Sequence, residues 1–160
     1  GARVLGTSSS DEKLRKAKEL GLDEGLNTKQ NPAWSTWVKQ QTHGEGADVI
    51  VEVGGAGTLR ESMKAVRVGG TIAQIGVLSG TEERLSVLPI LMRQIRISGI
   101  YVGSRTMMEA MNRSIAAARL RPIVGKIFPF SETVESYRYL EQERHFGKVV
   151  ISLQSNKKRS

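Results

Sequence analysis

The residues of this sequence that are best suited to binding a ligand follow its first apolar stretch. Ser8, Ser9 and Ser10 come directly after the strand-like run Ala2–Thr7, and Lys13 lies one turn into the helix that should follow. Serine hydroxyls, the N–H groups of a helix start and an ammonium group together suit a phosphate. The same residues also fit a serine-rich helix cap beside a solvated lysine. The sequence leaves both interpretations open.

A second candidate is the glycine-rich turn Gly54–Gly57, which follows an apolar run and precedes a helical pattern. Dinucleotide-binding turns have the pattern G-x-G-x-x-G/A, in which the last small residue allows close packing of helix against strand. Counted from Gly55, this pattern places Arg60 at that last position. The match is weak, so a tight turn that lines a site is the favoured interpretation. The phosphate-loop pattern G-x-x-x-x-G-K-[ST] does not occur in the sequence.

Other residue patterns that carry chemistry are missing from the sequence. It has no G-x-S-x-G nucleophile elbow and no H-E-x-x-H zinc motif. Its two histidines, His43 and His145, are far apart and have no ligand spacing around them. The sequence has no cysteine, so it offers no thiolate ligand and no disulfide. We therefore assign no catalytic residue and expect no zinc to be bound by this chain.

Length and composition restrict the class of protein. The 160 residues, 39% of them hydrophobic, suffice for one globular domain or slightly more. No apolar run approaches the roughly 18 residues of a membrane span, and no signal-peptide pattern opens the chain. Together with the lack of cysteine, this favours a cytoplasmic protein without membrane contact. The net charge of +8 is scattered and has no aromatic-rich basic stripe, so an anionic cofactor is a better candidate partner than nucleic acid.

The order of strand and helix patterns indicates the fold class. Capping patterns of the type S/T-x-x-E predict helix starts at Ser9 and Thr58, and Ser104 caps a further helix. Strands that alternate with helices of 10–15 residues predict βαβ units, and hence a doubly wound parallel α/β sheet. Strands are expected over residues 2–7, 24–27, 47–53, 71–76, 95–101, 126–130 and 148–152.

Two later helices show apolar residues at helical spacing. In the helix after Ser104, the residues that share one face are expected to belong to the core. In the helix that starts at Ser131, the equivalent face is expected to point inward. The first face comprises Met108, Met111, Ile115 and Ala118, and the second comprises Val134, Tyr137 and Leu140.

Several longer stretches resemble the nucleotide domain of the medium-chain dehydrogenase/reductase family. Residues 2–21, ARVLGTSSSDEKLRKAKELG, resemble its second strand and helix. Residues 46–55, GADVIVEVGG, and 66–76, VRVGGTIAQIG, resemble its fourth and fifth strands. Residues 125–140, GKIFPFSETVESYRYL, and 145–151, HFGKVVI, resemble its C-terminal end. The resemblance covers nearly the whole chain in the family's order, with quinone-reductase-like and zinc alcohol-dehydrogenase-like branches nearest.

The resemblance implies hydride transfer between a nicotinamide cofactor and a carbonyl, an alcohol or an activated alkene. Because hydroxyls stand where an acidic residue would bind the ribose of NAD, NADP(H) is expected in preference to NAD(H). By matching position, Ser8, Ser9 and Lys13 would hold the adenosine phosphate. The other implied contacts are Val53 and Gly54 on the adenine–ribose side, Ile75, Gly76 and Val77 at the nicotinamide, Tyr101, Val102 and Gly103 at the carboxamide, and Lys148 near the phosphates.

Two parts of the family pattern are not found in this sequence. The family's first strand with its glycine-rich turn, and its N-terminal catalytic domain with the metal ligands, have no counterpart here. We expect a partial dinucleotide-binding domain over residues 1–122, a segment over 123–152 that returns toward the catalytic domain, and a basic tail over 153–160. The chain is then the cofactor-binding portion of a larger enzyme and inactive alone.

Without its first strand, such a sheet leaves the backbone groups of the two neighbouring strands without partners. The neighbours close the gap, another chain fills it, or the fold is marginal. We expect a homo-oligomer, with the edge strand Ile95–Tyr101 as the family's contact between sheets. The alternative is a non-catalytic, degenerate dinucleotide fold that acts in self-association or protein interaction.

Overall fold

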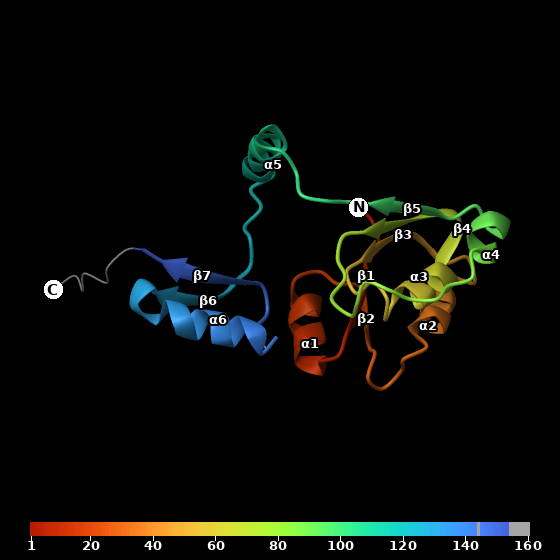
Figure 1. The fold of residues 1–160 in the computed structure, drawn as a ribbon, viewed down its shortest axis with the longest axis horizontal. Helices are drawn as coiled ribbons and strands as arrows, with labels where there is room; N and C mark the ends of the chain where they lie inside the picture. Colours follow the sequence, from red (N-terminus) through yellow and green to blue (C-terminus); the bar gives the residue numbers. More distant parts are fainter. Residues whose placement is uncertain (144, 154–160) are drawn as a thin grey trace. The chain divides into compact units, whose positions relative to one another are not determined.

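The computed structural model describes residues 1–143 and 145–153, and these form two compact units (Figure 1). The first unit runs from Gly1 to Val102, and the second begins at Gly103. The expected domain boundary at residue 122 stays a prediction, and residues 154–160 of the expected basic tail lie outside the described residues.

The first unit alternates strands and helices, as the sequence predicts. Their order is β1 (Leu5–Ser8), α1 (Asp11–Glu19), β2 (Glu24–Asn27), α2 (Trp34–Gln41), β3 (Ala47–Glu52), α3 (Leu59–Ala65), β4 (Val66–Gln74), α4 (Leu88–Met92) and β5 (Arg96–Gly99). The second unit comprises α5 (Arg105–Ala117), β6 (Val124–Pro129), the 3₁₀ turn η1 (Phe130–Glu132), α6 (Thr133–Glu141) and β7 (Lys148–Ser152).

All strand pairs in the described residues are parallel, which confirms the α/β fold class. The first unit contains a two-stranded sheet, β1–β2, and a three-stranded sheet in the order β3–β4–β5. No strand ladder joins β1 to β3, so within the described residues these two strands do not close the gap between the sheets. The second unit has the pair β6–β7.

The core of the first unit lies where α3 and α4 cover one face of the β3–β4–β5 sheet (Figure 1). Ile72, in the middle of β4, has no solvent exposure and packs with Met63 of α3. The same cluster includes Val66 and Ile95, with Ile50, Leu59, Leu85 and Ile90 packed against it. The valines that alternate with these residues along β3, Val49 and Val51, are exposed.

Both expected capping boxes are wrong in detail. Helix α1 is capped by Ser10 rather than Ser9, since the Ser10 Oγ accepts a hydrogen bond from the Lys13 N–H at 3.3 Å. Thr58 precedes α3, but its hydroxyl donates to a carboxylate instead of capping the helix. A serine beside the expected cap, or a stronger acceptor nearby, overrides the local pattern. The cap at Ser104 is confirmed by its hydrogen bond from the Met107 N–H.

Strand limits also differ from those expected. The strand expected at 71–76 begins at Val66, and Gly69 and Gly70 lie within it rather than before it. A register shift between Ala47 and Val49 of the partner strand accommodates this stretch. Extra residues in one strand of a pair bend it without ending it. At the other edge of the sheet, β5 is shorter than the expected range of 95–101.

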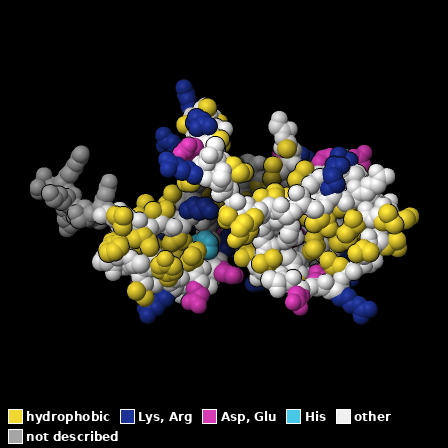
Figure 2. Space-filling model, turned by 45° about the horizontal axis from the view of Figure 1, so that its top comes forward, with side chains coloured by type: hydrophobic (Ala, Val, Ile, Leu, Met, Phe, Trp, Pro, Cys, Tyr) yellow, Lys and Arg dark blue, Asp and Glu magenta, His cyan; other side chains and the backbone are white. Residues whose placement is uncertain are grey.

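The expected inward faces of the last two helices are wrong. Met108 and Met111 are exposed, and α5 buries none of its residues. In α6 the buried side chain is Ser136, whereas Val134 and Tyr137 are exposed. Figure 2 shows that hydrophobic side chains gather on the visible surface. Helix α6 instead packs its Tyr139 ring against the Phe128 ring of β6, and the two ring centroids are 5.7 Å apart. Helical spacing identifies residues that share a face but not which face another element covers.

Candidate functional site

The candidate site lies where the strands of the β3–β4–β5 sheet end. Ligands of open parallel sheets bind outside the carboxyl ends of the strands, because the connections that begin there carry the binding groups. Val53 and Gly54 follow β3, and Ile75, Gly76 and Val77 follow β4. The parallel register Glu52↔Gln74↔Gly99 brings the ends of the three strands to one edge.

Backbone hydrogen bonds join the segments that follow β3 and β4, which we call the first turn (residues 53–58) and the second turn (residues 75–80). The Leu78 N–H donates to the Val53 carbonyl at 3.1 Å, and the Ser79 N–H donates to the Gly54 carbonyl at 2.7 Å. In the opposite direction, the Ala56 N–H donates to the Gly80 carbonyl at 3.1 Å. The structure therefore brings five of the predicted site residues together, namely Val53, Gly54, Ile75, Gly76 and Val77.

Two positions in the turns require glycine, one for the close approach of the turns and one for the geometry of the first turn itself. A Cβ at Gly76 would lie 2.6 Å from the Val53 carbonyl oxygen, and a Cβ at Gly54 would overlap the Thr58 hydroxyl. Neither glycine has a positive φ, so the restriction is steric rather than conformational. A side chain at position 76 would push the two turns apart, whereas one at position 54 would displace Thr58 within the first turn.

A buried carboxylate, Glu52, lies beneath the first turn. Its side chain is at the end of β3 and the residue is 3% exposed. The Gly54 and Gly55 N–H groups donate to its Oε1 at 2.7 and 3.1 Å, and the Thr58 hydroxyl donates to the same oxygen. The Ser62 hydroxyl donates to Oε2. Burial alone would raise the pKa of Glu52, but these four hydrogen bonds outweigh it and hold the pKa below its usual value, so the ionised form is favoured.

Glu52 occupies the backbone donors that a phosphate at the first turn would need. The N–H groups that could face an anion, those of Gly54 and Gly55, already donate to a carboxylate of this chain. A second anion at the same place would be repelled by that charge. These contacts favour the tight-turn interpretation. Sequence reasoning missed Glu52, although an acidic residue that follows the run Val49–Val51 and lies two positions before a pair of glycines was a signal for it.

The end of β1 carries the residues predicted to hold a phosphate. The Ser8 carbonyl accepts from the Thr28 N–H at 2.9 Å, and the Ser8 Oγ accepts from the Ser10 N–H at 3.2 Å. Ser9 is exposed, and Lys13 lies on the first turn of α1. The first carboxylate after β1 is Asp11. Its two oxygens accept from the side-chain amides of Asn27 at 2.9 Å and Gln30 at 3.4 Å.

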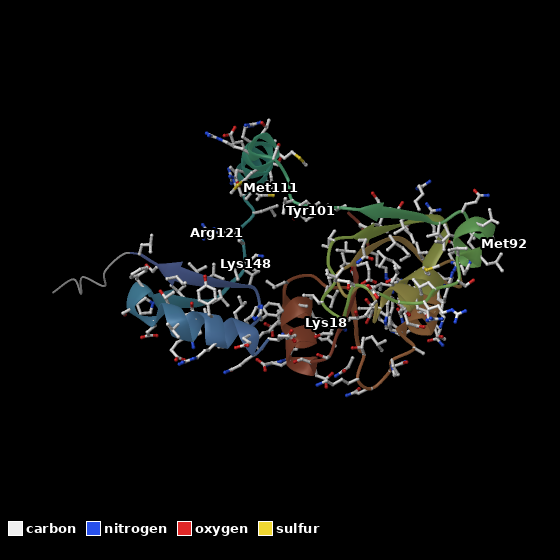
Figure 3. The ribbon with its side chains drawn as sticks, in the orientation of Figure 1. Lys18, Met92, Tyr101, Met111, Arg121 and Lys148 are labelled. Atoms are coloured by element: carbon white, nitrogen blue, oxygen red, sulfur yellow. The ribbon has the colours of Figure 1, made fainter. Side chains whose placement is uncertain are left out.

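Four further predicted site residues are Tyr101, Val102, Gly103 and Lys148. No contact among the described residues of either compact unit brings them to the two turns. Tyr101 and Val102 follow β5 and are 91% and 79% exposed (Figure 3). Gly103 and Lys148 belong to the second unit, where the Lys148 N–H donates to the Ile123 carbonyl at 2.8 Å. The cofactor contacts of all these residues stay predictions.

Two kinds of feature are absent from the described residues. No group of three or more histidine, cysteine, aspartate or glutamate side chains there could hold a metal ion. Among the same residues, no helix has the length and apolar character that crossing a membrane requires.

Comparison with known proteins identifies relatives over nearly all of this sequence. A zinc-type alcohol dehydrogenase-like protein of Schizosaccharomyces pombe is 40% identical over 157 residues, which are 96% of this chain and 45% of that protein. An L-threonine 3-dehydrogenase of Symbiobacterium thermophilum is 31% identical over 92% of this chain and 43% of its own length. The chain thus spans about half the length of the relatives it matches.

Solved structures agree with this assignment. An NAD-dependent alcohol dehydrogenase superposes with a TM-score of 0.86 and 38% identity, over 96% of this chain and 45% of the other. A 2-haloacrylate reductase superposes with a TM-score of 0.79 and 27% identity, over 97% of this chain and 51% of the other. The sequence profile of the zinc-binding dehydrogenases matches residues 1–117. The chain therefore belongs to the zinc-binding dehydrogenase family.

Proposed function

We propose that this chain is the cofactor-binding portion of an NADP(H)-preferring oxidoreductase and is inactive alone. The observation that carries the proposal is the pair of turns joined by three backbone hydrogen bonds at the carboxyl edge of a parallel sheet. The glycines that permit this approach suit a flat ligand that packs closely on backbone. The relatives are named as dehydrogenases and reductases. A cytoplasmic location, expected from the lack of cysteine, is part of the proposal.

The proposed role of the chain is to position the cofactor. When bound, the nicotinamide supplies the hydride that is exchanged with a carbonyl, an alcohol or an activated alkene. The second turn would face the nicotinamide, and Val53 and Gly54 would line the adenine–ribose side. Backbone groups of residues 101–103 would contact the carboxamide, and Lys148 would lie near the phosphates.

The preference for NADP(H) rests on the end of β1. Ser8 and Ser9 offer hydroxyls, Lys13 offers a positive charge, and the carboxylate of Asp11 is engaged by two amides. A phosphate on the ribose would meet these donors, while the Asp11 carboxylate is directed toward Asn27 and Gln30. One relative is named as NAD-dependent, so a direct comparison of the two cofactors is needed.

We expect the chain to bind NADPH more tightly than NADH in a calorimetric titration. Ser8→Asp should weaken NADPH binding by about tenfold or more and leave NADH binding unchanged or tighter, because the new carboxylate repels the ribose phosphate. Ser86→Asp is the matched control, since Ser86 accepts from the Leu88 N–H at the start of α4 and aspartate can do the same. Tighter binding of NADH by the unchanged chain would refute the assignment of Ser8 and Lys13.

A second candidate function is self-association without catalysis. It is supported by the sheet edges, since β1 and β3 do not pair with each other and all four residues of β5 are exposed. We propose a homo-oligomer that forms through the segment Ile95–Tyr101 in either case. Sedimentation combined with the titration separates the two functions, because a stable oligomer that binds neither dinucleotide favours the second.

A further inference from the structure

We propose that Glu52 is the positioning residue of the cofactor site, and that it fixes the second turn through the first. The inference rests on the proposed function only in that the two turns would hold the dinucleotide. The Glu52 carboxylate contacts the first turn and α3, not the ligand. The Glu52 backbone carbonyl accepts from the Ile75 N–H at 2.9 Å, but this contact does not involve the side chain. Any effect of the carboxylate on the second turn must therefore pass through the first turn and the backbone hydrogen bonds that join it to the second.

The first step is that the Glu52 carboxylate is hydrogen-bonded directly to the first turn. One carboxylate oxygen accepts from two successive N–H groups, those of Gly54 and Gly55, at 2.7 and 3.1 Å. Hydrogen bonds to a charged acceptor are roughly twice as strong as neutral ones and fix the direction of the donors. With both N–H groups turned toward Glu52, the carbonyls of Val53 and Gly54 are oriented toward the second turn.

The second step is that hydrogen bonds between the two turns extend this restraint to the second turn. The carbonyls of Val53 and Gly54 accept from the N–H groups of Leu78 and Ser79. The second turn also accepts a side-chain hydrogen bond from Gln74, which is the register partner of Glu52. The Gln74 Nε2 donates to the Gly76 carbonyl. Two polar residues that are neighbours in the sheet thus each hold one turn, and the backbone bonds join them.

The third step is that a structural role alone would not require a carboxylate here. A buried charge costs several kcal/mol of desolvation, which an apolar side chain of similar volume would avoid. Glu61 provides an internal comparison. It is also a partly buried carboxylate with a lowered pKa, since the hydrogen bonds from Lys64 and Ser35 outweigh the effect of burial. However, Glu61 joins α2 to α3, and its hydrogen bonds go to Ser35 and Lys64 rather than to either turn.

Amide hydrogen exchange measured by NMR tests this inference on the chain itself. Glu52→Met keeps the volume and removes the acceptor. We expect exchange at Ala56, Leu78 and Ser79 to accelerate by about tenfold or more relative to Ile100. The Ile100 N–H donates to the Gln74 carbonyl and reports on the sheet. Glu52→Gln should stay within about threefold of the unchanged chain, because its oxygen can still accept from the turn and its amide can donate to the Ser62 hydroxyl.

The controls separate positioning from general loss of stability. Glu61→Met should accelerate exchange uniformly over the first unit, without selecting the second turn. Equal acceleration of Ile100 and Leu78 by Glu52→Met, or no change at Leu78, would overturn the inference. If Glu52→Met does not fold, Thr58→Val decides, because it removes one donor to Glu52 at nearly constant volume. Selective acceleration at the second turn then supports the inference, and an unchanged pattern refutes it.

Titration with NADPH distinguishes this inference from the proposed function. If the unchanged chain binds NADPH, Glu52→Met should weaken binding by about tenfold and Glu52→Gln should restore it. Unchanged binding in Glu52→Met would refute the positioning role. If the unchanged chain binds no dinucleotide while the exchange pattern is as expected, the proposed function fails for this chain and the role of Glu52 in fixing the turns stands.

Discussion

Gly76→Ala is expected to lower the free energy of unfolding of the first unit by about 2–3 kcal/mol. The added Cβ would lie 2.6 Å from the carbonyl oxygen and 3.2 Å from the Cα of Val53. Both neighbours are backbone atoms, which cannot rotate away as the end of a side chain can. The two turns must therefore separate, and the hydrogen bonds from Leu78 and Ser79 lengthen or break.

Urea unfolding followed by tryptophan fluorescence measures this effect. Both tryptophans of the chain, Trp34 and Trp37, lie in α2, so the signal reports on the first unit. Gly99→Ala is the matched control, because a Cβ there meets no atom within 4 Å and Gly99 has no positive φ. It should change the free energy of unfolding by less than about 0.5 kcal/mol. Equal effects of the two substitutions would contradict the steric account.

Sequence reasoning was most accurate where a structural element is bounded by turn residues on both sides. The strands Glu24–Asn27 and Lys148–Ser152 have the limits that the sequence predicts. Strand β4 was misjudged because Gly69 and Gly70 normally end an element, whereas here Gly70 fits against the Asp48 carbonyl and the Val66 side chain inside the sheet. A glycine in a strand can mark close backbone approach as well as an end.

The errors at the candidate site have a common physical cause. Thr58 and Glu61 satisfy a capping pattern that is local in sequence, but each has a stronger partner elsewhere, Glu52 for the hydroxyl and Ser35 and Lys64 for the carboxylate. A one-dimensional pattern contains no information about competing partners that the fold brings near. For the same reason Glu52 was interpreted only as part of an apolar strand, although its side chain accepts hydrogen bonds from Gly54, Gly55 and Thr58 of the first turn.

The site residues that came from family resemblance differ in how far the structure supports their grouping. The five residues of the two turns lie together because parallel strands β3 and β4 end at one edge. This grouping follows from strand order alone and could be expected from the sequence. The grouping of Lys148 with these five residues could not be expected from strand order, because Lys148 belongs to the other compact unit.

Arg93→Met is expected to destabilise the first unit by about 2–4 kcal/mol, since it leaves several backbone carbonyls without a charged donor. The guanidinium of Arg93 donates to the carbonyls of Met63 at 2.7 Å and Lys64 at 3.4 Å, and also to that of Val66. These carbonyls lie at the end of α3, where helix carbonyls have no partner within the helix. Met63 and Val66 are buried, so water cannot readily replace the lost donor.

The backbone of residue 93 also connects α4 to β4, and this contact is kept in every variant at this position, so the expected loss comes from the guanidinium alone. The Arg93 carbonyl accepts from the Gly69 N–H at 2.9 Å, within the stretch where the register of β3 and β4 shifts. Arg93→Lys should have an intermediate effect, since one ammonium cannot reproduce the planar fork that reaches separate carbonyls. Arg15→Met, at an exposed position of α1, serves as control and should change stability by less than about 0.5 kcal/mol in the same urea experiment. Suppose that Arg93→Met lowered the free energy of unfolding no more than Arg15→Met does. Water would then have to satisfy the carbonyls that end α3, and the hydrogen bonds of Arg93 at the junction of α3 and β4 would not be needed for stability.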